Sequence, residues 1–191
     1  MLILASQSPR RRQLLQQLGV AFEVRKVDVP EVRQAGESAV GYVERVAREK
    51  GRAVLAELHD KPDVQVLSAD TEVVLDDDVF GKPADAVAAG NMLRRLSGRT
   101  HEVVSAVWLL GHDREACTRC VSRVTFAALD ADQIDAYVGT GEPFDKAGGY
   151  AIQGRAAAFV ERLEGSYSGV MGLPLFETAQ LLRQAGVDGA M

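Results

Sequence analysis

Apolar and polar positions along the chain fall into segments that predict strands and helices in turn. Residues 2–5 form a short apolar run, which is typical of a buried strand. Ser8 and Pro9 then favour the start of a helix, because serine caps helix N-termini and proline suits the first helical position. Leucines at helical spacing follow over residues 14–18. The chain is therefore expected to open with a strand, a polar turn and a helix.

The rest of the chain continues this interleaving. The predicted strands cover residues 22–27, 64–69, 100–110, 115–127 and 158–163. The predicted helices cover residues 37–58, 84–96, 130–138 and 174–185. The strand at 64–69 is expected to end at Asp70 and Thr71. Residues 72–75 are expected to continue in extended form into a turn at 76–78.

These elements predict an α/β protein with a mixed sheet. Strands and helices alternate, as they do in parallel sheets, but residues 100–127 form an antiparallel hairpin about a turn at 111–114. We therefore expect a mixed twisted sheet with flanking helices and a cleft between two lobes. No internal repeat or low-complexity linker divides the chain, so residues 1–191 are interpreted as a single domain.

The length and charge of the chain exclude several classes of protein. The 191 residues are 47% hydrophobic, which is enough for a buried core and excludes a disordered chain. The chain has 22 Lys and Arg residues against 27 Asp and Glu residues, and this net charge of −5 argues against binding to nucleic acid polymers or anionic membranes. No apolar run approaches the roughly 18 to 20 residues that span a bilayer, and residues 1–5 are too short for a signal peptide. These features predict a soluble cytoplasmic protein.

The two cysteines, Cys117 and Cys120, have the C-x-x-C spacing found in some redox and zinc sites. A redox pair should open a helix, whereas these residues lie in a predicted strand, where a spacing of three places them on opposite faces. A zinc site needs about four ligands, and the three histidines show no ligand spacing around the pair. We interpret both cysteines as incidental thiols of a reducing compartment.

Segment 6–12 has the chemistry of a phosphate site. Arg10, Arg11 and Arg12 are expected in the first turn of a helix, where the positive end of the helix dipole disfavours cations unless an anion is bound. Helix N-terminal amides, serine hydroxyls and guanidinium groups together offer many donors to phosphate oxygens. The alternative is a solvated run of charge that keeps the helix soluble.

Asp70 and Thr71, at the expected end of a buried strand, are the second candidate. Open α/β sheets place their ligands at strand ends, and a carboxylate there can bind Mg²⁺ or accept a proton from water. The alternative is an aspartate that only terminates the strand through a local turn. Glu31, Lys50 and Lys82 are further candidates that gain meaning only if the fold brings them to the same place.

The third candidate is the glycine-rich segment 145–154. Its glycines have the spacing of a P-loop, but Arg155 and Ala156 stand where a P-loop requires Lys and Ser or Thr, so a P-loop is excluded. The glycines are interpreted as allowing the backbone to approach a ligand, and the Gln153 amide can offer a donor and an acceptor to a nucleobase. No G-x-G-x-x-G motif follows the first strand, which disfavours a nicotinamide-dependent enzyme.

Together these motifs resemble those of the Maf (septum formation protein) nucleotide pyrophosphatases. The resemblance covers nearly the whole chain and lies in residues 4–11, 47–50, 69–71, 82–83, 96–98, 145–148 and 172–174. It implies a mixed α/β fold like that of inosine triphosphate pyrophosphatases, with a cleft that holds a nucleoside triphosphate. The implied reaction is hydrolysis of the α–β phosphoanhydride to a nucleoside monophosphate and pyrophosphate, with a divalent metal.

Three positions mark the branch within this family, and here they are Arg10, Thr71 and Gln153. This trio resembles the dTTP/UTP pyrophosphatase branch, whereas the 7-methyl-GTP branch has an aromatic residue, Gln and Glu at these positions. The residue chemistry agrees, because a neutral amide complements a uracil or thymine edge while a carboxylate suits a cationic methylated guanine. The resemblance therefore implies that the substrates are dTTP, UTP and modified pyrimidine nucleotides.

Residue chemistry and the resemblance together give a mechanistic hypothesis. Asp70 accepts a proton from the attacking water, and Glu31 and Asp70 hold Mg²⁺ or Mn²⁺; these two roles of Asp70 compete, because a metal-bound carboxylate is a weaker base. The basic residues of the expected site, with Arg12, are predicted to converge on one cleft of an otherwise acidic protein. The expected substrate-binding residues are Ser8, Arg10, Arg11, Lys50, Thr71, Lys82, Lys146 and Gln153.

Two other functions remain open at this point. A nucleotide-binding regulator of cell division would need the phosphate site but no base, and it would bind nucleotides without turnover. A pyrophosphatase for 7-methyl-GTP or noncanonical nucleotides would keep Asp70 and differ in base preference. The resemblance suggests a homodimer, and no stripe in the sequence marks its interface.

Overall fold

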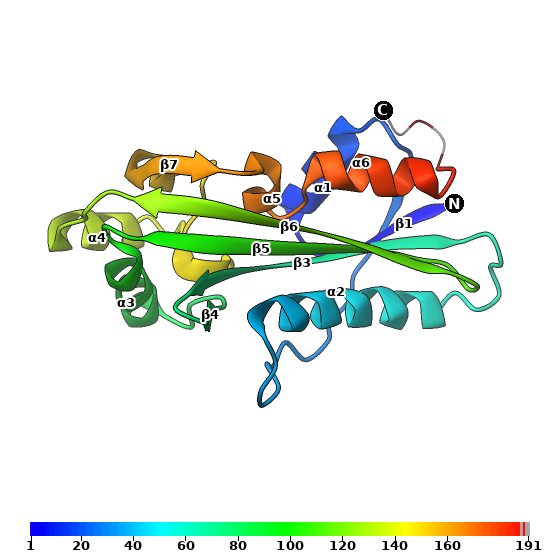
Figure 1. Cartoon of the computed structure of the whole chain (residues 1–191), viewed down its shortest axis with the longest axis horizontal. Coiled ribbons are helices and arrows are strands. Elements are labelled where there is room, and N and C mark those ends of the chain that lie inside the picture. Colours follow the sequence, from blue (N-terminus) through cyan, green and yellow to red (C-terminus); the bar gives the residue numbers. More distant parts are fainter. Residues whose placement is uncertain (188, 190–191) are drawn as a thin grey trace.

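The computed structural model describes residues 1–187 and residue 189, and its core is a seven-stranded mixed sheet (Figure 1). The strands are β1 (Leu2–Ala5), β2 (Glu23–Arg25), β3 (Gln65–Leu75), β4 (Asp78–Phe80), β5 (Thr100–Leu110), β6 (Glu115–Phe126) and β7 (Val160–Glu164). They lie in the order β2-β1-β3-β5-β6-β7, and β4 pairs with β3 outside this path. β1 is parallel to β2 and β3, and the other pairs are antiparallel. The expected mixed α/β sheet is confirmed.

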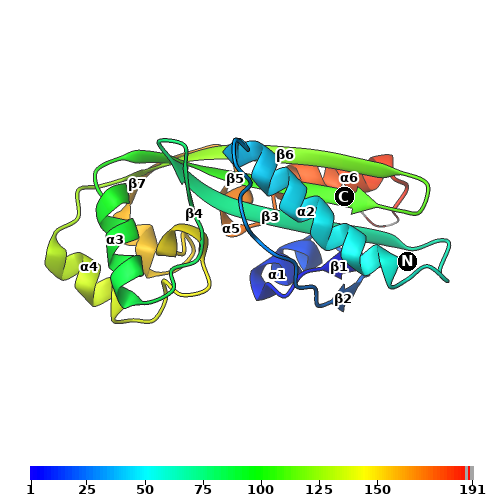
Figure 2. The ribbon, with the colours of Figure 1, turned by 90° about the horizontal axis from the view of Figure 1, so that it is seen from below.

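Helices cover both faces of this sheet. They are α1 (Pro9–Gln17), α2 (Ala39–Ala56), α3 (Ala86–Leu96), α4 (Ala131–Val138), α5 (Tyr167–Met171) and α6 (Leu175–Gln184), with short 3-10 helices at Ala147–Gly149 and Arg155–Phe159. Figure 1 shows α2 along one face of the long strands and α1, α5 and α6 along the other. Figure 2 shows α3 and α4 near one end of the long strands, beyond the end of α2. None of the described helices has both the length and the apolar character that crossing a membrane requires.

Alternating side chains on β1 show why both faces of the sheet are buried. Leu2 and Leu4 pack with leucines of α1 and α6, while Ile3 and Ala5 pack with Val54 of α2 on the opposite face. Burying one such aliphatic side chain contributes about 1.5–3 kcal/mol. A separate apolar cluster joins α3 and α4 to the far ends of β3, β5 and β6. The helices therefore pack in two groups along the same long strands.

Most predicted elements form close to the expected residues. The hairpin of β5 and β6 is confirmed, and so is the helix that follows Asp130, which caps α4 through a capping box with Gln133. The last predicted strand begins at Val160, because the preceding residues form a 3-10 helix. α5 is missing from the prediction, since a five-residue helix is too short to show helical periodicity.

The predicted end of a strand at Asp70 is wrong. β3 continues without a break to Leu75, so Asp70 lies in the middle of a strand of 11 residues. β5 pairs with β3 along nearly its whole length, and these backbone hydrogen bonds keep the polar residues in extended conformation. The turn comes at Asp76 and Asp77, which both adopt positive φ angles of 53° and 66°.

The edge of β3 nearest β1 has a gap in its pairing. β1 pairs with β3 as far as Ser68, and β4 pairs with it from Val73 onward. Within the described residues, no strand lies beside residues 69–72 on this edge. Asp70 and its neighbours therefore border an opening in the sheet, although they do not end a strand.

Candidate active site

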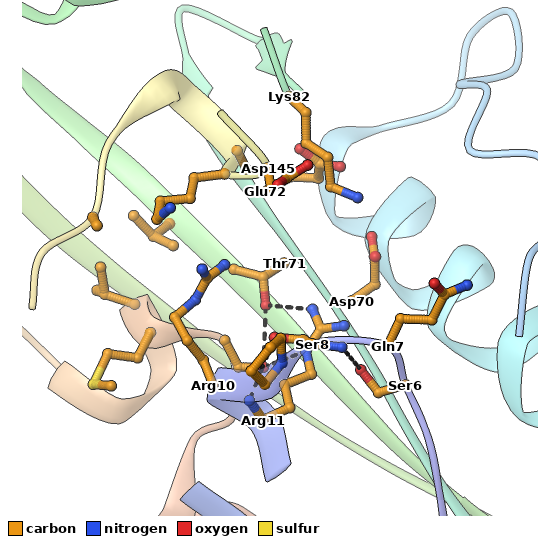
Figure 3. A pocket seen from close by; sticks show the side chains of 18 of the residues that line it. Ser6, Gln7, Ser8, Arg10, Arg11, Asp70, Thr71, Glu72, Lys82 and Asp145 are labelled. Atoms are coloured by element: carbon orange, nitrogen blue, oxygen red, sulfur yellow. Dashed lines mark hydrogen bonds between the residues drawn. The ribbon is translucent and has the colours of Figure 1, made fainter. Parts of the chain in front are cut away.

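The gap beside β3 opens into a cleft of about 590 Å³, a size typical of sites for small ligands. In Figure 3, Arg10 and Arg11 lie on one side of the cleft and Lys82 on the other, with Asp70 and Thr71 between them. The ten residues expected to act in catalysis, substrate binding or metal binding all line this cleft: Ser8, Arg10, Arg11, Glu31, Lys50, Asp70, Thr71, Lys82, Lys146 and Gln153. The fold therefore brings together residues that lie far apart in the sequence.

The N-terminus of α1 forms one wall of the cleft. Ser8 is the N-cap, and its hydroxyl accepts a hydrogen bond from the Arg11 amide at 3.4 Å. The Ser8 amide donates to Ser6 Oγ at 3.1 Å. The first turn contains arginines and no acidic residue, so its amides, hydroxyls and guanidinium groups make a positive region that favours an anion. Burial, followed in size by the charge of Arg11, lowers the pKa of Arg10, and a bound anion would raise this pKa again.

Arg11 is held by contacts from two other elements. Its Nε donates to the carbonyl of Gly172 at 2.8 Å, and its Nη2 donates to Thr71 Oγ1 at 3.3 Å. Gly172 follows α5 with a φ of 118°, in the left-handed region that favours glycine.

Arg12 was expected at the same site, and this prediction is wrong: Arg12 is exposed and is not among the described residues that line the cleft. Successive helix positions point about 100° apart, so three neighbouring arginines do not face one ligand.

Lys50 joins two carboxylates on another wall of the cleft. Its ammonium nitrogen lies 2.5 Å from Glu31 Oε1 and 2.7 Å from Asp70 Oδ1. Lys50 and Asp70 are both buried. α2 positions Lys50, because this helix begins at the N-cap Ser38 and packs its apolar side against β3 and β5. Removing one partner from such a buried pair would leave an unpaired charge.

Glu31 stays ionised in this arrangement. Burial raises its pKa, but the hydrogen bond and charge of Lys50 and the charges of Lys82 and Arg11 outweigh that effect. The pKa of Glu31 therefore lies below its ordinary value. The loop that follows β2 thus brings a negative charge to the cleft, where it balances nearby cations.

Glu72 is a cleft residue that the sequence analysis missed. It lies two residues after Asp70 on β3, so both side chains point to the same face of the strand. Glu72 is buried, and burial followed by the charges of Asp70 and Glu31 raises its pKa to about 9. The alternation of Ser68, Asp70 and Glu72 on one face is the sequence signal that could have identified it.

The oxygens of these carboxylates suit a hard divalent cation. Asp70 Oδ2 and Glu72 Oε2 are buried and have no hydrogen-bond partner among the described residues. Carboxylate oxygens are the ligands that Mg²⁺ and Mn²⁺ prefer. In the described part of the chain, no group of three or more His, Cys, Asp or Glu side chains is already arranged as a metal site. The residues therefore fit a cation whose remaining coordination positions are filled by substrate oxygens and water, as is usual for Mg²⁺.

Glu142 closes the loop that carries Lys146 and Gln153. Its carboxylate accepts hydrogen bonds from the Tyr137 hydroxyl at 2.9 Å and from the Arg155 amide at 3.0 Å. Burial raises the pKa of Glu142, but these hydrogen bonds outweigh it and the pKa lies below its ordinary value. One side chain thereby joins the two ends of the loop.

Lys82 and Lys146 add positive charge to the cleft. Lys82 is exposed and follows β4, while Lys146 is half-buried and donates to the Phe144 carbonyl at 3.2 Å. Burial and then the charge of Arg10 lower the pKa of Lys146. Gln153 is exposed on the same loop, where its amide borders the cleft.

Tyr150 also lines the cleft and is supported from behind by the buried His101. The Tyr150 hydroxyl lies 2.8 Å from His101 Nε2, and both rings pack edge-on against Phe126. Burial lowers the pKa of His101 to about 4, so the imidazole is neutral at pH 7. A single histidine in a strand carries no sequence signal for this role.

The cysteines behave as predicted from their spacing. Cys117 is exposed and Cys120 is buried, so they lie on different sides of β6, and both are free thiols. Partial desolvation of the thiol groups raises the pKa of both, and with the charge of Glu44 it raises that of the otherwise exposed Cys117 to about 11. Neither group has the lowered thiol pKa that a reactive redox cysteine needs.

A family model described as Maf-like protein matches residues 1–185 of the chain. The chain is 57% identical over 188 residues to a protein of Xanthomonas campestris pv. campestris named dTTP/UTP pyrophosphatase, covering 97% of this chain and 99% of that protein. It is 56% identical over 189 residues to a Methylococcus capsulatus protein of the same name, covering 99% of this chain and 93% of that one. A Xylella fastidiosa protein named nucleoside triphosphate pyrophosphatase is 57% identical over 183 residues, which are 95% of this chain and 97% of that protein.

Proposed function

The chain belongs to the Maf family, and on this premise we propose that it hydrolyses dTTP and UTP to the nucleoside monophosphate and pyrophosphate. Relatives 56–57% identical over nearly their whole length bear the name dTTP/UTP pyrophosphatase. The observation that carries the proposal is the cleft, in which the donors of the α1 N-terminus and the Asp70 carboxylate line the same space. Modified pyrimidine nucleotides of the same shape are included in the proposed substrates.

The triphosphate binds between the two basic walls of the cleft. Ser8 and the first amides of α1 offer donors to phosphate oxygens, and Arg11 adds a guanidinium group that is already fixed by Gly172. Lys82, on the other side, and Lys146 supply further positive charge to the cleft. These groups would stabilise the negative charge that develops on the departing pyrophosphate.

Asp70 accepts a proton from the attacking water in this proposal. Its Oδ1 accepts a hydrogen bond from Lys50, whereas Oδ2 is buried and has no partner among the described residues. Lys50 can therefore hold the carboxylate in place while the second oxygen receives the proton. The attack breaks the α–β phosphoanhydride.

Glu31 and Asp70 would hold the divalent cation, Mg²⁺ or Mn²⁺, with Glu72 beside them. When bound, the cation would draw charge from the phosphate oxygens and so favour attack by water. The chain's own part is to supply the carboxylate oxygens and to balance them with Lys50, which contacts both Glu31 and Asp70. Glu72 Oε2 has no hydrogen-bond partner among the described residues, so it is available to the cation. Asp70 Oδ2 also lacks such a partner, but it cannot bind the cation and accept the proton at the same time, so these two roles of Asp70 compete.

Arg10, Thr71 and Gln153 select the nucleotide in this proposal. All three line the cleft, and they come from α1, β3 and the loop closed by Glu142. The Gln153 amide is neutral and can pair with a uracil or thymine edge, which presents both donors and acceptors. A methylated, cationic guanine would lack a charge partner at this position.

We place this activity in the cytoplasm, where it would act on the nucleoside triphosphate pool. The two free thiols fit a reducing compartment. The same proposal includes a homodimer in which each chain carries its own cleft, because the cleft residues named above all belong to one chain.

A nucleotide panel with pyrophosphate detection tests the function. dTTP, UTP, CTP and 7-methyl-GTP would each be incubated with the protein, with Mg²⁺, with Mn²⁺ or with a chelator. We expect pyrophosphate from dTTP and UTP at rates at least about tenfold above those for the other two, and no product with the chelator. Nucleotide binding without any turnover would overturn the proposal and favour a regulatory protein.

A further inference from the structure

A buried serine lies directly behind Thr71. Thr71 on β3 and Ser105 on β5 are opposite each other in the antiparallel pair, and their hydroxyl oxygens are 2.7 Å apart. Ser105 is 0% exposed, so it cannot touch a nucleotide in the cleft. Its Oγ also lies 2.8 Å from the carbonyl of Gly169 in α5, to which it donates a hydrogen bond.

The proton inventory of these groups fixes the direction of each hydrogen bond. A serine hydroxyl has one proton, and a carbonyl can only accept, so the Ser105 proton is used on Gly169. The proton between the two hydroxyls must therefore come from Thr71. Arg11 can only donate, and its Nη2 donates to the Thr71 oxygen at 3.3 Å. The chain of bonds thus runs from Arg11 through Thr71 and Ser105 to Gly169.

The Thr71 proton has one other acceptor within reach. The carbonyl of Gly172 lies 3.4 Å from Thr71 Oγ1, but it already accepts the Arg11 Nε at 2.8 Å. The shorter contact of 2.7 Å to Ser105 is the stronger one. Ser105 therefore decides where the Thr71 proton points.

We propose that Ser105 is a positioning residue for the nucleotide site: by taking the Thr71 proton, it keeps the Thr71 oxygen as an acceptor for Arg11. This proposal rests on the proposed function of the cleft. Without Ser105 the Thr71 hydroxyl turns its proton toward Gly172 or the cleft, where it competes with the Arg11 donors. Arg11 then loses one of the two contacts that aim it at the phosphates.

Binding of a UTP analogue with an α–β imido bridge, measured by calorimetry, tests the proposal without turnover. We expect S105A to weaken binding about tenfold, which corresponds to about 1.4 kcal/mol. S105T keeps the hydroxyl and should bind within about threefold of the wild type. S68A is the matched control. Ser68 lies on β3, is fully buried like Ser105, and also donates a hydrogen bond to a backbone carbonyl, that of Ala47, at 2.7 Å. S68A should bind like the wild type even if both alanine variants unfold more readily.

A double-mutant cycle with T71V shows whether Ser105 acts through Thr71. Valine has the shape of threonine without the hydroxyl, so S105A should add less than about twofold in the T71V background. Equal binding by S105A and the wild type, equal losses in S105A and S68A, or additive effects in the cycle would overturn the proposal. If S105A does not fold, S105C replaces it, because a thiol is a weak acceptor and should cause the same loss. Absence of pyrophosphate release by the wild type would overturn the proposed function and leave this binding test intact.

Discussion

Lys50 is the residue on which the charge balance of the cleft depends. It is buried and contacts both Glu31 and Asp70. Lys50→Met would remove the cation that contacts both carboxylates, so we expect the free energy of unfolding to fall by roughly 3 kcal/mol and the activity to be lost. Urea unfolding and pyrophosphate release from UTP measure the two effects.

The exposed Lys61 provides a control for the loss of a lysine charge. Lys61→Met should change the free energy of unfolding by less than about 0.5 kcal/mol and leave the activity intact. Similar stability of the Lys50 and Lys61 variants would contradict a structural role for the contacts of Lys50 with Glu31 and Asp70.

Gln153 is the residue through which base preference is most easily tested. Gln153→Glu places a negative charge at the cleft edge on an exposed side chain, so the fold should not change. We expect the ratio of kcat/KM for UTP to that for 7-methyl-GTP to fall by about tenfold or more. The measurement is steady-state pyrophosphate release with both nucleotides. An unchanged ratio would show that Gln153 does not select the nucleobase.

His101 makes the stability depend on pH. Its folded pKa of about 4 lies below the ordinary value of 6.5, so the unfolded chain binds the proton more tightly. His101 therefore makes its full contribution to the free energy of unfolding above pH 6.5, and this contribution is lost as the pH falls toward 4. His101→Gln keeps a polar partner for Tyr150 but does not titrate.

Urea unfolding at several pH values separates this effect from that of the acidic residues. Between pH 6.5 and 4 the wild type should lose roughly 3 kcal/mol more than His101→Gln. Parallel losses in the two proteins would show that His101 does not cause the difference. Far-UV circular dichroism at pH 7 checks that both start folded.

At the residue scale, the sequence was informative where a residue type was unusual for its place. Asp70 is a candidate from the sequence because it follows an apolar run, whereas Lys50 becomes one only in company with the other candidates, and both line the cleft. Glu72 and Tyr150 line it too, but glutamate and tyrosine are ordinary residues in a strand or loop. Their roles depend on burial and on neighbours that only the fold supplies, such as Glu31 near Glu72 and His101 behind Tyr150.

At the element scale, β3 shows how pairing overrides local sequence. The polar residues at 70–72 favour an end to the strand, yet β5 holds the chain extended to Leu75. A strand end is therefore not the reason for expecting a ligand beside Asp70. The site lies at a gap between β1 and β4 along the edge of β3, and the sequence contains no local sign of that gap.

The packing of the glycine-rich segment 145–154 against β3 can be tested at Gly148. Gly148 has a φ of +71°, and an added Cβ would lie 2.7 Å from Val73 Cγ2. Gly148→Ala therefore combines backbone strain with a steric clash, and we expect a loss of about 3 kcal/mol in the free energy of unfolding.

Gly141 is the matched control for this variant. Its φ is +76°, and nothing lies within 4 Å of an added Cβ. Gly141→Ala should cost only the backbone strain, about 1 kcal/mol. Denaturant unfolding of the two variants gives the difference, and equal losses would show that contact with Val73 does not constrain the loop.

At the scale of the whole molecule, the net charge of −5 does not extend to the cleft, whose lining has five basic side chains and five acidic ones. The interleaved pattern predicted the mixed sheet correctly, and the basic motifs predicted most of the cleft. The cleft gathers basic side chains from α1, α2 and two loops, and they are Arg10, Arg11, Lys50, Lys82 and Lys146. Which of them share a space depends on strand order and helix rotation, so Arg12 could not be separated from Arg11 before the fold was known.

We propose that this cleft hydrolyses pyrimidine nucleoside triphosphates with Asp70 as the proton acceptor. The most direct measurement compares pyrophosphate release from UTP by the wild type and by Asp70→Asn under saturating Mg²⁺ or Mn²⁺. Asparagine keeps the shape of aspartate but is not a base, so kcat should fall by about 10²–10⁴-fold in a protein that still folds. Pyrophosphate release by Asp70→Asn at a rate near that of the wild type would show that Asp70 is not the proton acceptor.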